Sequence, residues 1–276
     1  MSCQTTTQII TKYQLIIDTF VLSVVASATT FLILYVFDCV PFIYNIIKLE
    51  FYLVKHDCFI ICNISRGSYK IIRSFTGHIF NIDDSRSIIE HMICNKNSRL
   101  ILDTYGGDVA SNDEILAHIS QSENKLTTYV MRKALSAGTT IALASPCLYM
   151  DENAYLGPTD PQTTISGDDI PIRTIMKLYE AKKENMSDSY LLKYYELKPF
   201  YDENVILTTK LLNNKFKKDV SNANKMSLIH KFSSGDISHS TPITFKYLKE
   251  FIKINVLIPV EIYYIFKIYT NIRRYL

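Results

Sequence analysis

A charge excess and the residue spacing of a metal site are both missing from the sequence. The 276 residues carry 30 Lys and Arg against 27 Asp and Glu, and the formal net charge of +3 predicts no basic face for a nucleic acid. The 6 cysteines are scattered, and Cys58 and Cys62 have no second Cys or His pair that would complete a zinc site. We therefore expect no nucleic-acid partner, no metal and no cofactor, and reduced thiols suit the cysteines at least as well as disulfides.

A long uncharged run stands near the amino terminus. Residues 19–37 contain no charged side chain and are flanked by Asp18 and Asp38. A stretch of about 20 apolar residues is long enough to cross the hydrocarbon core of a bilayer. We therefore predict a transmembrane anchor within an amino-terminal segment of residues 1–48, and a single-pass membrane protein. A cleaved signal peptide and a buried or interfacial helix are the alternatives, although bulky residues occupy the place of cleavage.

The orientation of this anchor is not specified by the flanking charges. Lys12 precedes the run, Lys48 and Lys55 follow it, and nearby acids nearly offset both sides. At the carboxyl end, residues 257–276 are apolar and aromatic but include charged side chains, which is typical of an amphipathic or docking helix. Residues 49–256 then form a domain of ordinary size.

The central part of the chain alternates between strand and helix patterns. Short apolar runs predict strands at residues 57–64, 100–102, 125–131 and 147–150. Helical spacing predicts helices at about residues 84–94, at 109–120 with Asp108 as cap, and after Ser136. This alternation is typical of βαβ units and of an α/β fold with a mainly parallel sheet.

The chain beyond Gln162 is expected to be mostly helical. A polar loop is predicted first, followed by a helix from Pro171 to about residue 185. A second helical stretch from 188 to 232 is expected to be interrupted at Pro199. Thr244 then has the composition of a cap for a last helix before the tail.

Two segments in the centre have the residue types that acyl transfer needs. Gly106 and Gly107 end an apolar run, and glycines allow a sharp turn that leaves N–H groups unobstructed. Ser136 precedes Ala137 and Gly138 at a predicted helix start, where amides and the helix dipole favour negative charge. A serine becomes a nucleophile when a base takes its proton and amides stabilise the oxyanion. An ordinary turn with Ser136 as helix cap explains the same pattern, so both interpretations stay open.

Three motifs in this region resemble those of a known family. They are L-D-T-Y-G-G-D-V at 102–109, A-L-S-A-G-T-T at 134–140 and M-D-E-N-A-Y-L-G-P-T-D-P-Q at 150–162. Together they resemble the serine dehydrogenase proteinase family, a branch of the Clp protease/crotonase-like superfamily that is related to signal peptide peptidase A. The resemblance implies a ββα-spiral fold, a homo-oligomer and Ser136 as nucleophile. It also implies an oxyanion hole formed by backbone amides in two pairs, Gly106 with Gly107 and Ala137 with Gly138.

The resemblance leaves the general base open. Clp proteases use a histidine shortly after the serine, whereas this chain has no histidine between His118 and His230. Relatives that use lysine point to Lys177 as the candidate base, because burial lowers the pKa of a lysine. His239, in the family-like segment S-H-S-T-P-I-T, is the second candidate. A solvated helix lysine and a structural loop histidine are the competing interpretations.

The last expectations concern Asp160 and Gln162 of the third motif and the activity of the chain. Asp160 and Gln162 are interpreted as side chains that hold their loop through hydrogen bonds to the backbone, with shaping of a substrate channel as the alternative. We expect a membrane-anchored serine peptidase acting on peptides or membrane-protein segments. A catalytically inactive, membrane-tethered scaffold is the alternative, favoured by the unassigned base and by Ala137, where many family members have glycine. Acyl-CoA chemistry, as in crotonases, needs no nucleophilic serine and is disfavoured by the serine motif.

Overall fold

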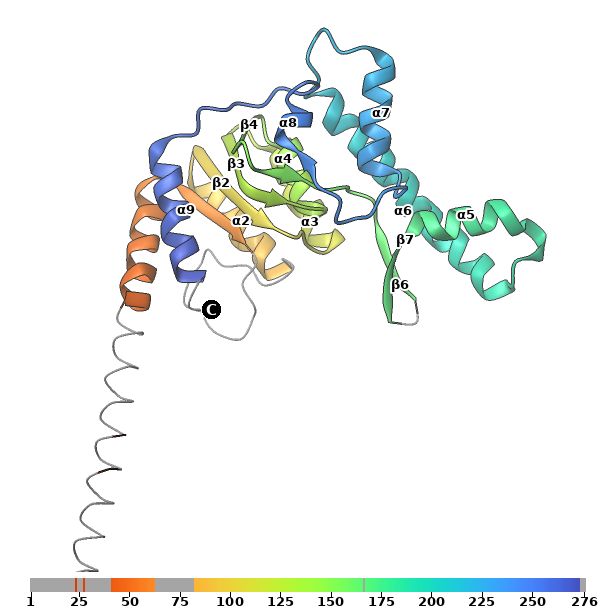
Figure 1. Cartoon of the computed structure of the whole chain (residues 1–276), viewed down its shortest axis with the longest axis horizontal. Helices are drawn as coiled ribbons and strands as arrows, with labels where there is room; N and C mark the ends of the chain where they lie inside the picture. Colours follow the sequence, from red (N-terminus) through yellow and green to blue (C-terminus); the bar gives the residue numbers. More distant parts are fainter. Residues whose placement is uncertain (1–22, 24–26, 28–40, 63–81, 166, 274–276) are drawn as a thin grey trace, which may run out of the picture.

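The computed structural model describes residues 23, 27, 41–62, 82–165 and 167–273, and these contain a 6-stranded sheet with helices on both faces (Figure 1). The strands of this sheet are β1 (Cys58–Cys62), β2 (Asn97–Thr104), β3 (Lys125–Ala134), β4 (Cys147–Met150), β5 (Tyr155–Leu156) and β8 (Ile243–Thr244). Their order is β1-β2-β3-β5-β8, with β4 also paired to β3. All pairs are parallel except β5 with β8, which confirms the predicted α/β fold with a mainly parallel sheet.

Strand β3 pairs with two successive strands along its length. It ends at the sheet edge where the glycine motif at 102–109 and the serine motif at 134–140 meet. Its residues 127–130 pair with β4, whereas Lys133 and Ala134 pair with β5. Ala134 also pairs with Thr104 at the end of β2. Because both strands run in the same direction, the glycines that follow β2 and the serine that follows β3 leave the sheet at the same edge.

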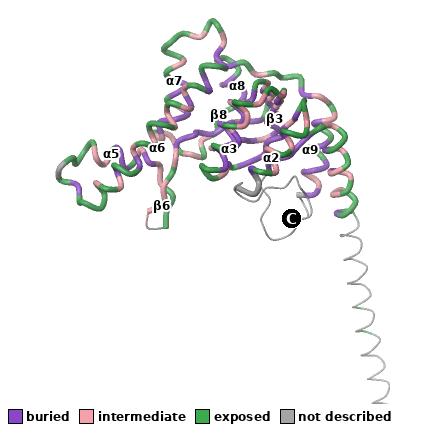
Figure 2. Tube along the Cα trace, turned by 180° about the vertical axis from the view of Figure 1, so that it is seen from behind, coloured by how far each residue is buried: buried purple, intermediate pink, exposed green. Residues whose placement is uncertain are grey.

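Side chains alternate between two hydrophobic clusters, one on each face of the sheet. In β1, Ile61 joins the cluster beneath α2 (Ile82–Cys94), α3 (Val109–Gln121) and α4 (Ala137–Ala144). Ile60 joins the cluster on the other face, where α9 (Val260–Arg273) packs beside the helical residues 41–55. Figure 2 shows the buried residues concentrated in the strands between these layers. Burial on both faces explains the continuous apolar runs of the central strands.

A smaller unit projects from the edge of the sheet (Figure 1). It consists of the hairpin β6 (Gln162–Ile165) and β7 (Asp168–Pro171), α5 (Ile172–Lys182), a short 3-10 helix (Lys183–Asn185) and the first half of α6 (Asp188–Asn213). The sequence predicted a polar loop where the hairpin forms. Ile165 and Ile170 pack against a separate cluster made by α5 and α6, and this contact stabilises strands in an otherwise polar segment.

Helix α6 corrects the prediction of a break at Pro199. The helix continues through this proline to Asn213, although proline removes one helical hydrogen bond and costs about 3 kcal/mol in a helix interior. Each half of α6 buries apolar side chains, Leu197 in the small cluster and Leu212 in the main core, and this packing outweighs the lost bond. The chain breaks instead before α7 (Asn222–Ser233), which Ser221 caps. Thr244 caps the short helix α8 (Phe245–Leu248), as predicted.

Within the described part of the chain, no helix combines the length and the apolar character needed to cross a membrane. The run at residues 19–37 lies outside the described residues apart from Ser23 and Ser27. The transmembrane anchor therefore stays a prediction.

Candidate active site

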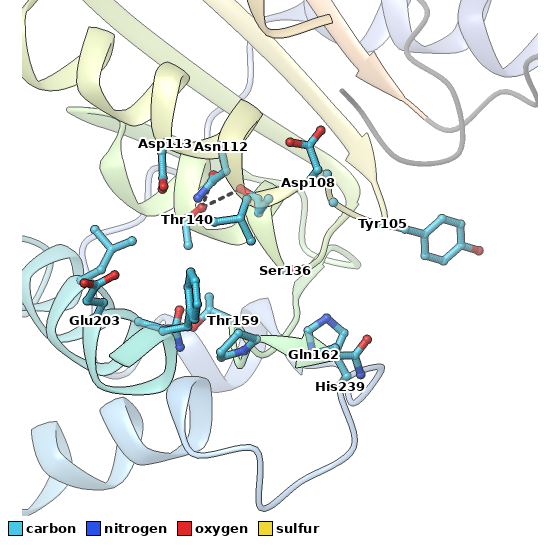
Figure 3. A pocket seen from close by; sticks show the side chains of 18 residues that line it. Tyr105, Asp108, Asn112, Asp113, Ser136, Thr140, Thr159, Gln162, Glu203 and His239 are labelled. Atoms are coloured by element: carbon cyan, nitrogen blue, oxygen red, sulfur yellow. Dashed lines mark hydrogen bonds between the residues drawn. The ribbon is translucent and has the colours of Figure 1, made fainter. Parts of the chain in front are cut away.

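A cavity of about 570 Å³ opens at the sheet edge where β2 and β3 end (Figure 3). Both predicted segments contribute to its lining, Gly106 and Gly107 from one and Ser136 and Ala137 from the other. His239 reaches the same cavity from the loop between α7 and β8. The structure therefore brings together residues that are more than a hundred positions apart in the chain.

Ser136 adopts a backbone conformation that few side chains tolerate. Its φ is 50° and its ψ is −121°, and a positive φ is strained for any residue except glycine. The carbonyl of Ser136 accepts hydrogen bonds from Thr139 N at 2.8 Å and Thr140 N at 3.2 Å, which hold it at the start of α4. Ser136 occupies the N-cap position of α4, as the alternative interpretation expected, but its side chain makes no capping hydrogen bond. A strained strand-to-helix turn presents the hydroxyl of the nucleophilic serine in α/β-hydrolases.

Two glycines are required around this turn. Gly106 has a φ of +117°, and a Cβ at this position would lie 2.9 Å from Ser136 Cβ. A Cβ on Gly138 would lie 2.5 Å from Thr104 Cγ2, so this glycine permits the close packing of α4 against β2. Both glycines therefore hold the ends of β2 and β3 together.

Two of the four predicted oxyanion amides are already engaged in the fold. Gly106 N donates to Thr104 Oγ1 at 3.1 Å, and Gly138 N donates to Leu135 O at 2.8 Å. Ala137 is the first residue of α4, where an N–H group has no intrahelical acceptor. The amide of Ala137 is therefore a candidate for the oxyanion hole, and that of Gly107 stays a prediction.

His239 is paired with a buried carboxylate. Its Nδ1 lies 3.0 Å from Oδ1 of Asp160, whose side chain is 1% exposed. When Asp160 is ionised, Nδ1–H donates this bond and Nε2, on the opposite side of the ring, is left as an acceptor. Oδ2 of Asp160 has no hydrogen-bond partner among the described residues, so the imidazole is the main polar contact of this carboxylate.

Sequence reasoning missed this role of Asp160. The motif that contains Asp160 was recognised, but its carboxylate was assigned to backbone hydrogen bonds. The pairing with His239 spans 79 residues, and the helices α5, α6 and α7 return the chain between them. The signal available in the sequence was that both residues stand in family-like motifs.

Lys177 lies outside the lining of the cavity. Its side chain is 54% exposed and its Nζ lies 2.5 Å from Oδ1 of Asp236, so the expected burial of its ammonium group is wrong. Helix α5 buries Ile172, Ile175 and Met176 on one face, whereas Lys177 lies on the exposed side of the helix. The hydrogen bond from Lys177 lowers the pKa of Asp236, which stands three residues before His239. Lys177 thus makes an exposed ion pair, and Asp236 has Arg173 and His230 as further partners.

The chain is similar to one protein family and to several individual proteins. The family model for ClpP-like SDH-type serine proteinases matches residues 59–274. Two uncharacterized proteins of Methanocaldococcus jannaschii are similar: MJ1495 is 29% identical over 171 residues and MJ0137 is 30% identical over 193 residues. These matches cover 62% and 68% of this chain but only 56% and 65% of the relatives. ClpP1 from Listeria monocytogenes aligns with a TM-score of 0.44 and 11% identity, over 72% of this chain and 88% of ClpP1.

Proposed function

The chain belongs to the ClpP-like SDH-type serine proteinase family, and from that premise we propose that it is a serine peptidase with Ser136 as nucleophile. The observation that carries the proposal is the strained backbone of Ser136. This residue lines the cavity, and its hydroxyl makes no capping hydrogen bond. A fold does not maintain a positive φ at a serine without a compensating gain, and such strain concentrates at functional sites.

In this proposal His239 is the general base and Asp160 orients it. Ser136 Oγ attacks the scissile carbonyl carbon while its proton passes to His239 Nε2, and the amides of Gly107 and Ala137 donate to the oxyanion. The C–N bond breaks, His239 returns the proton to the leaving amine, and an acyl-enzyme forms. Water then releases the acyl group by the same steps. The buried Asp160 and the exposure of Lys177 favour histidine over lysine as the base.

Labelling by a fluorophosphonate tests these assignments. We expect the wild-type chain to be labelled and Ser136→Ala not to be. His239→Gln should label at least about a hundredfold more slowly, because general-base catalysis contributes about 10²–10⁴ in rate. Lys177→Met is the control and should keep most of its rate. Equal labelling of wild type and Ser136→Ala refutes the peptidase, and a large loss confined to Lys177→Met returns the role of base to lysine.

One observation favours the alternative of a catalytically inactive scaffold. Among the described residues, no hydrogen bond joins Ser136 Oγ to His239. In peptidases without substrate this bond is often long and tightens on binding, which is why we place the active enzyme first. A wild-type chain that resists labelling while remaining folded would favour the scaffold.

We also propose a single-pass anchor at residues 19–37 and a homo-oligomeric assembly, with peptides or membrane-protein segments as substrates. The support for the anchor is the uncharged run itself. The helical residues 41–55 follow it and expose Ile43, Ile47 and Phe51. Exposed apolar side chains in a row are typical of a surface that contacts another protein or a membrane. The support for the assembly is the ClpP-like family.

A further inference from the structure

The cavity beside Ser136 is acidic. Asp108, Asp113 and Glu203 line it, and no Lys or Arg is among the described residues of its lining. Asp108 is engaged as the cap of α3, since its two carboxylate oxygens accept from Ser111 N at 2.9 Å and from Ser111 Oγ at 2.6 Å. Asp113 and Glu203 are therefore the two carboxylates that the cavity presents to a ligand.

These two carboxylates have no cationic side chain paired with them among the described residues. Within the described part of the chain, neither Asp113 nor Glu203 takes part in an ion pair. Two other acids of α6, the helix that carries Glu203, do form ion pairs, since Glu196 pairs with Lys193 and Asp202 with Lys198. Asp113 and Glu203 are both exposed to solvent, but partial desolvation of Asp113, together with the nearby charge of Glu203, raises the pKa of Asp113. A cation between the two carboxylates would relieve this repulsion.

The walls of the cavity and the place of the acids in it indicate which kind of cation would fit. Val109, Phe200 and Leu207 provide apolar surface in the same lining. Figure 3 shows Asp113 and Glu203 at the end of the cavity away from His239. Lysine and arginine combine an aliphatic stem with a terminal cation, which suits apolar walls that end in carboxylates. Among the described residues, no group of three or more His, Cys, Asp and Glu is arranged to hold a metal ion instead.

We propose that this end of the cavity is a specificity pocket for a Lys or Arg side chain on the acyl side of the scissile bond. The polarity follows from the chemistry, because His239 must protonate the leaving amine and so lies on the leaving-group side. The end away from His239 then receives the side chain of the residue whose carbonyl Ser136 attacks. The inference rests on the proposed peptidase function and adds the class of its substrate.

The test compares two peptidyl diphenyl phosphonates that differ only in one side chain, aminobutyl as in lysine or butyl as in norleucine. Both react irreversibly with a nucleophilic serine, so their rates report the preference without product analysis. We expect the lysine-like probe to react about tenfold to a hundredfold faster with the wild-type chain, since hydrogen bonds to charged groups are among the stronger ones. Asp113→Asn with Glu203→Gln should bring the ratio of the two rates close to one. Glu196→Gln, on the same helix outside the cavity, should keep the wild-type ratio.

Each outcome separates the pocket from the catalytic proposal. The ratio of two probes cancels a general loss of reactivity in a variant. A wild-type chain that a neutral fluorophosphonate labels at Ser136, but that reacts equally with both phosphonates, overturns the pocket and leaves the peptidase standing. A lysine preference that survives the double substitution overturns the assignment to these two carboxylates. Absence of all labelling at Ser136 overturns both proposals.

A second measurement covers the case in which the double variant does not fold. A phosphonate with a glutamate-like side chain carries the opposite charge and is tested on the wild-type chain alone. It should react more slowly than the norleucine-like probe, because the two carboxylates repel it. A glutamate-like probe that reacts as fast as the lysine-like one contradicts the proposal.

Discussion

At the residue scale, Gly106 controls the position of Ser136 directly. An added Cβ would meet Leu135 O and Ser136 Cβ, each at 2.9 Å, in a backbone with a φ of +117°. We predict that Gly106→Ala removes fluorophosphonate labelling, because a misplacement of about 1 Å is enough to cost a hundredfold in rate. The strained backbone should also lower the free energy of unfolding by about 1–3 kcal/mol, measured in urea.

Gly167→Ala is the matched control. Gly167 also has a positive φ, +92°, but a Cβ there meets nothing within 4 Å. This variant should lose stability through the same backbone strain while its labelling stays at the wild-type rate. If Gly106→Ala is labelled like Gly167→Ala, the contact between Gly106 and Ser136 does not matter for reactivity.

Lys215 gives a prediction for pH dependence. Burial lowers its pKa from 10.5 to about 8, while Nζ donates to Pro146 O at 3.2 Å and to Ser145 O. The folded chain loses this proton from about pH 8 upward and the unfolded chain keeps it until about pH 10.5. Between these values the unfolded state binds more protons, so the free energy of unfolding should rise with pH, by up to about 3 kcal/mol from this group.

Urea unfolding at several pH values checks the contribution of Lys215. Wild type and Lys215→Met are compared, because other groups titrate in the same range and cancel in the difference. The free energy of wild type relative to the variant should increase from pH 8 to pH 10.5. A difference that stays constant over this range contradicts the assignment.

At the scale of elements, a buried hydrogen bond ties α9 to the sheet. Tyr269 Oη donates to Oδ2 of Asp103 at 2.9 Å, and Asp103 is fully buried beside Arg132. We predict that Tyr269→Phe lowers the free energy of unfolding by about 1–3 kcal/mol, because a buried carboxylate loses a donor. Tyr263→Phe is the control on the same helix, since its hydrogen bond to the partly exposed Asp151 is accessible to solvent and water can replace it. Equal losses in the two variants would show that burial of Asp103 is not the cause.

Periodicity decided which elements could be predicted from the sequence. The central strands are buried on both faces and the helices α2 and α3 have one apolar side, so their patterns were read correctly. The hairpin β6–β7 and the unbroken α6 depend on contacts with α5 and with the core that no local pattern encodes. The apolar positions of α5 place Lys177 on the outward face of the helix. This helical phase was a sequence signal that the prediction overlooked.

The candidate site divides in the same way. The proximity of Ser136 and the glycines follows directly from strands that end at one edge of the sheet, so the sequence was sufficient to predict that these residues lie together. The pairing of His239 with Asp160 was not predictable in this manner, because the two residues meet only after three helices return the chain to the sheet. The acidic lining from Asp113 and Glu203 likewise comes from two helices that are distant in sequence.

At the scale of the whole molecule, the predicted anchor would join the chain on the side of α9. Residues 41–55 pack beside α9 on the sheet face opposite α3 and α4 (Figure 1). The cavity, which α3 and α6 line, therefore lies away from the helix that continues from the uncharged run.

Flotation of the full chain with phospholipid vesicles tests the anchor. We predict that the wild type floats with the vesicles and resists extraction by high salt. Val25→Lys with Leu32→Lys should abolish flotation, because each lysine near the centre of a spanning helix costs about 2.5–3.5 kcal/mol. Val25→Ala with Leu32→Ala, which keeps the run uncharged, should still float. A wild-type chain that stays in the unbound fraction, or a lysine variant that floats equally well, would rule out a hydrophobic anchor at residues 19–37, because neither result is compatible with burial of this run in the bilayer.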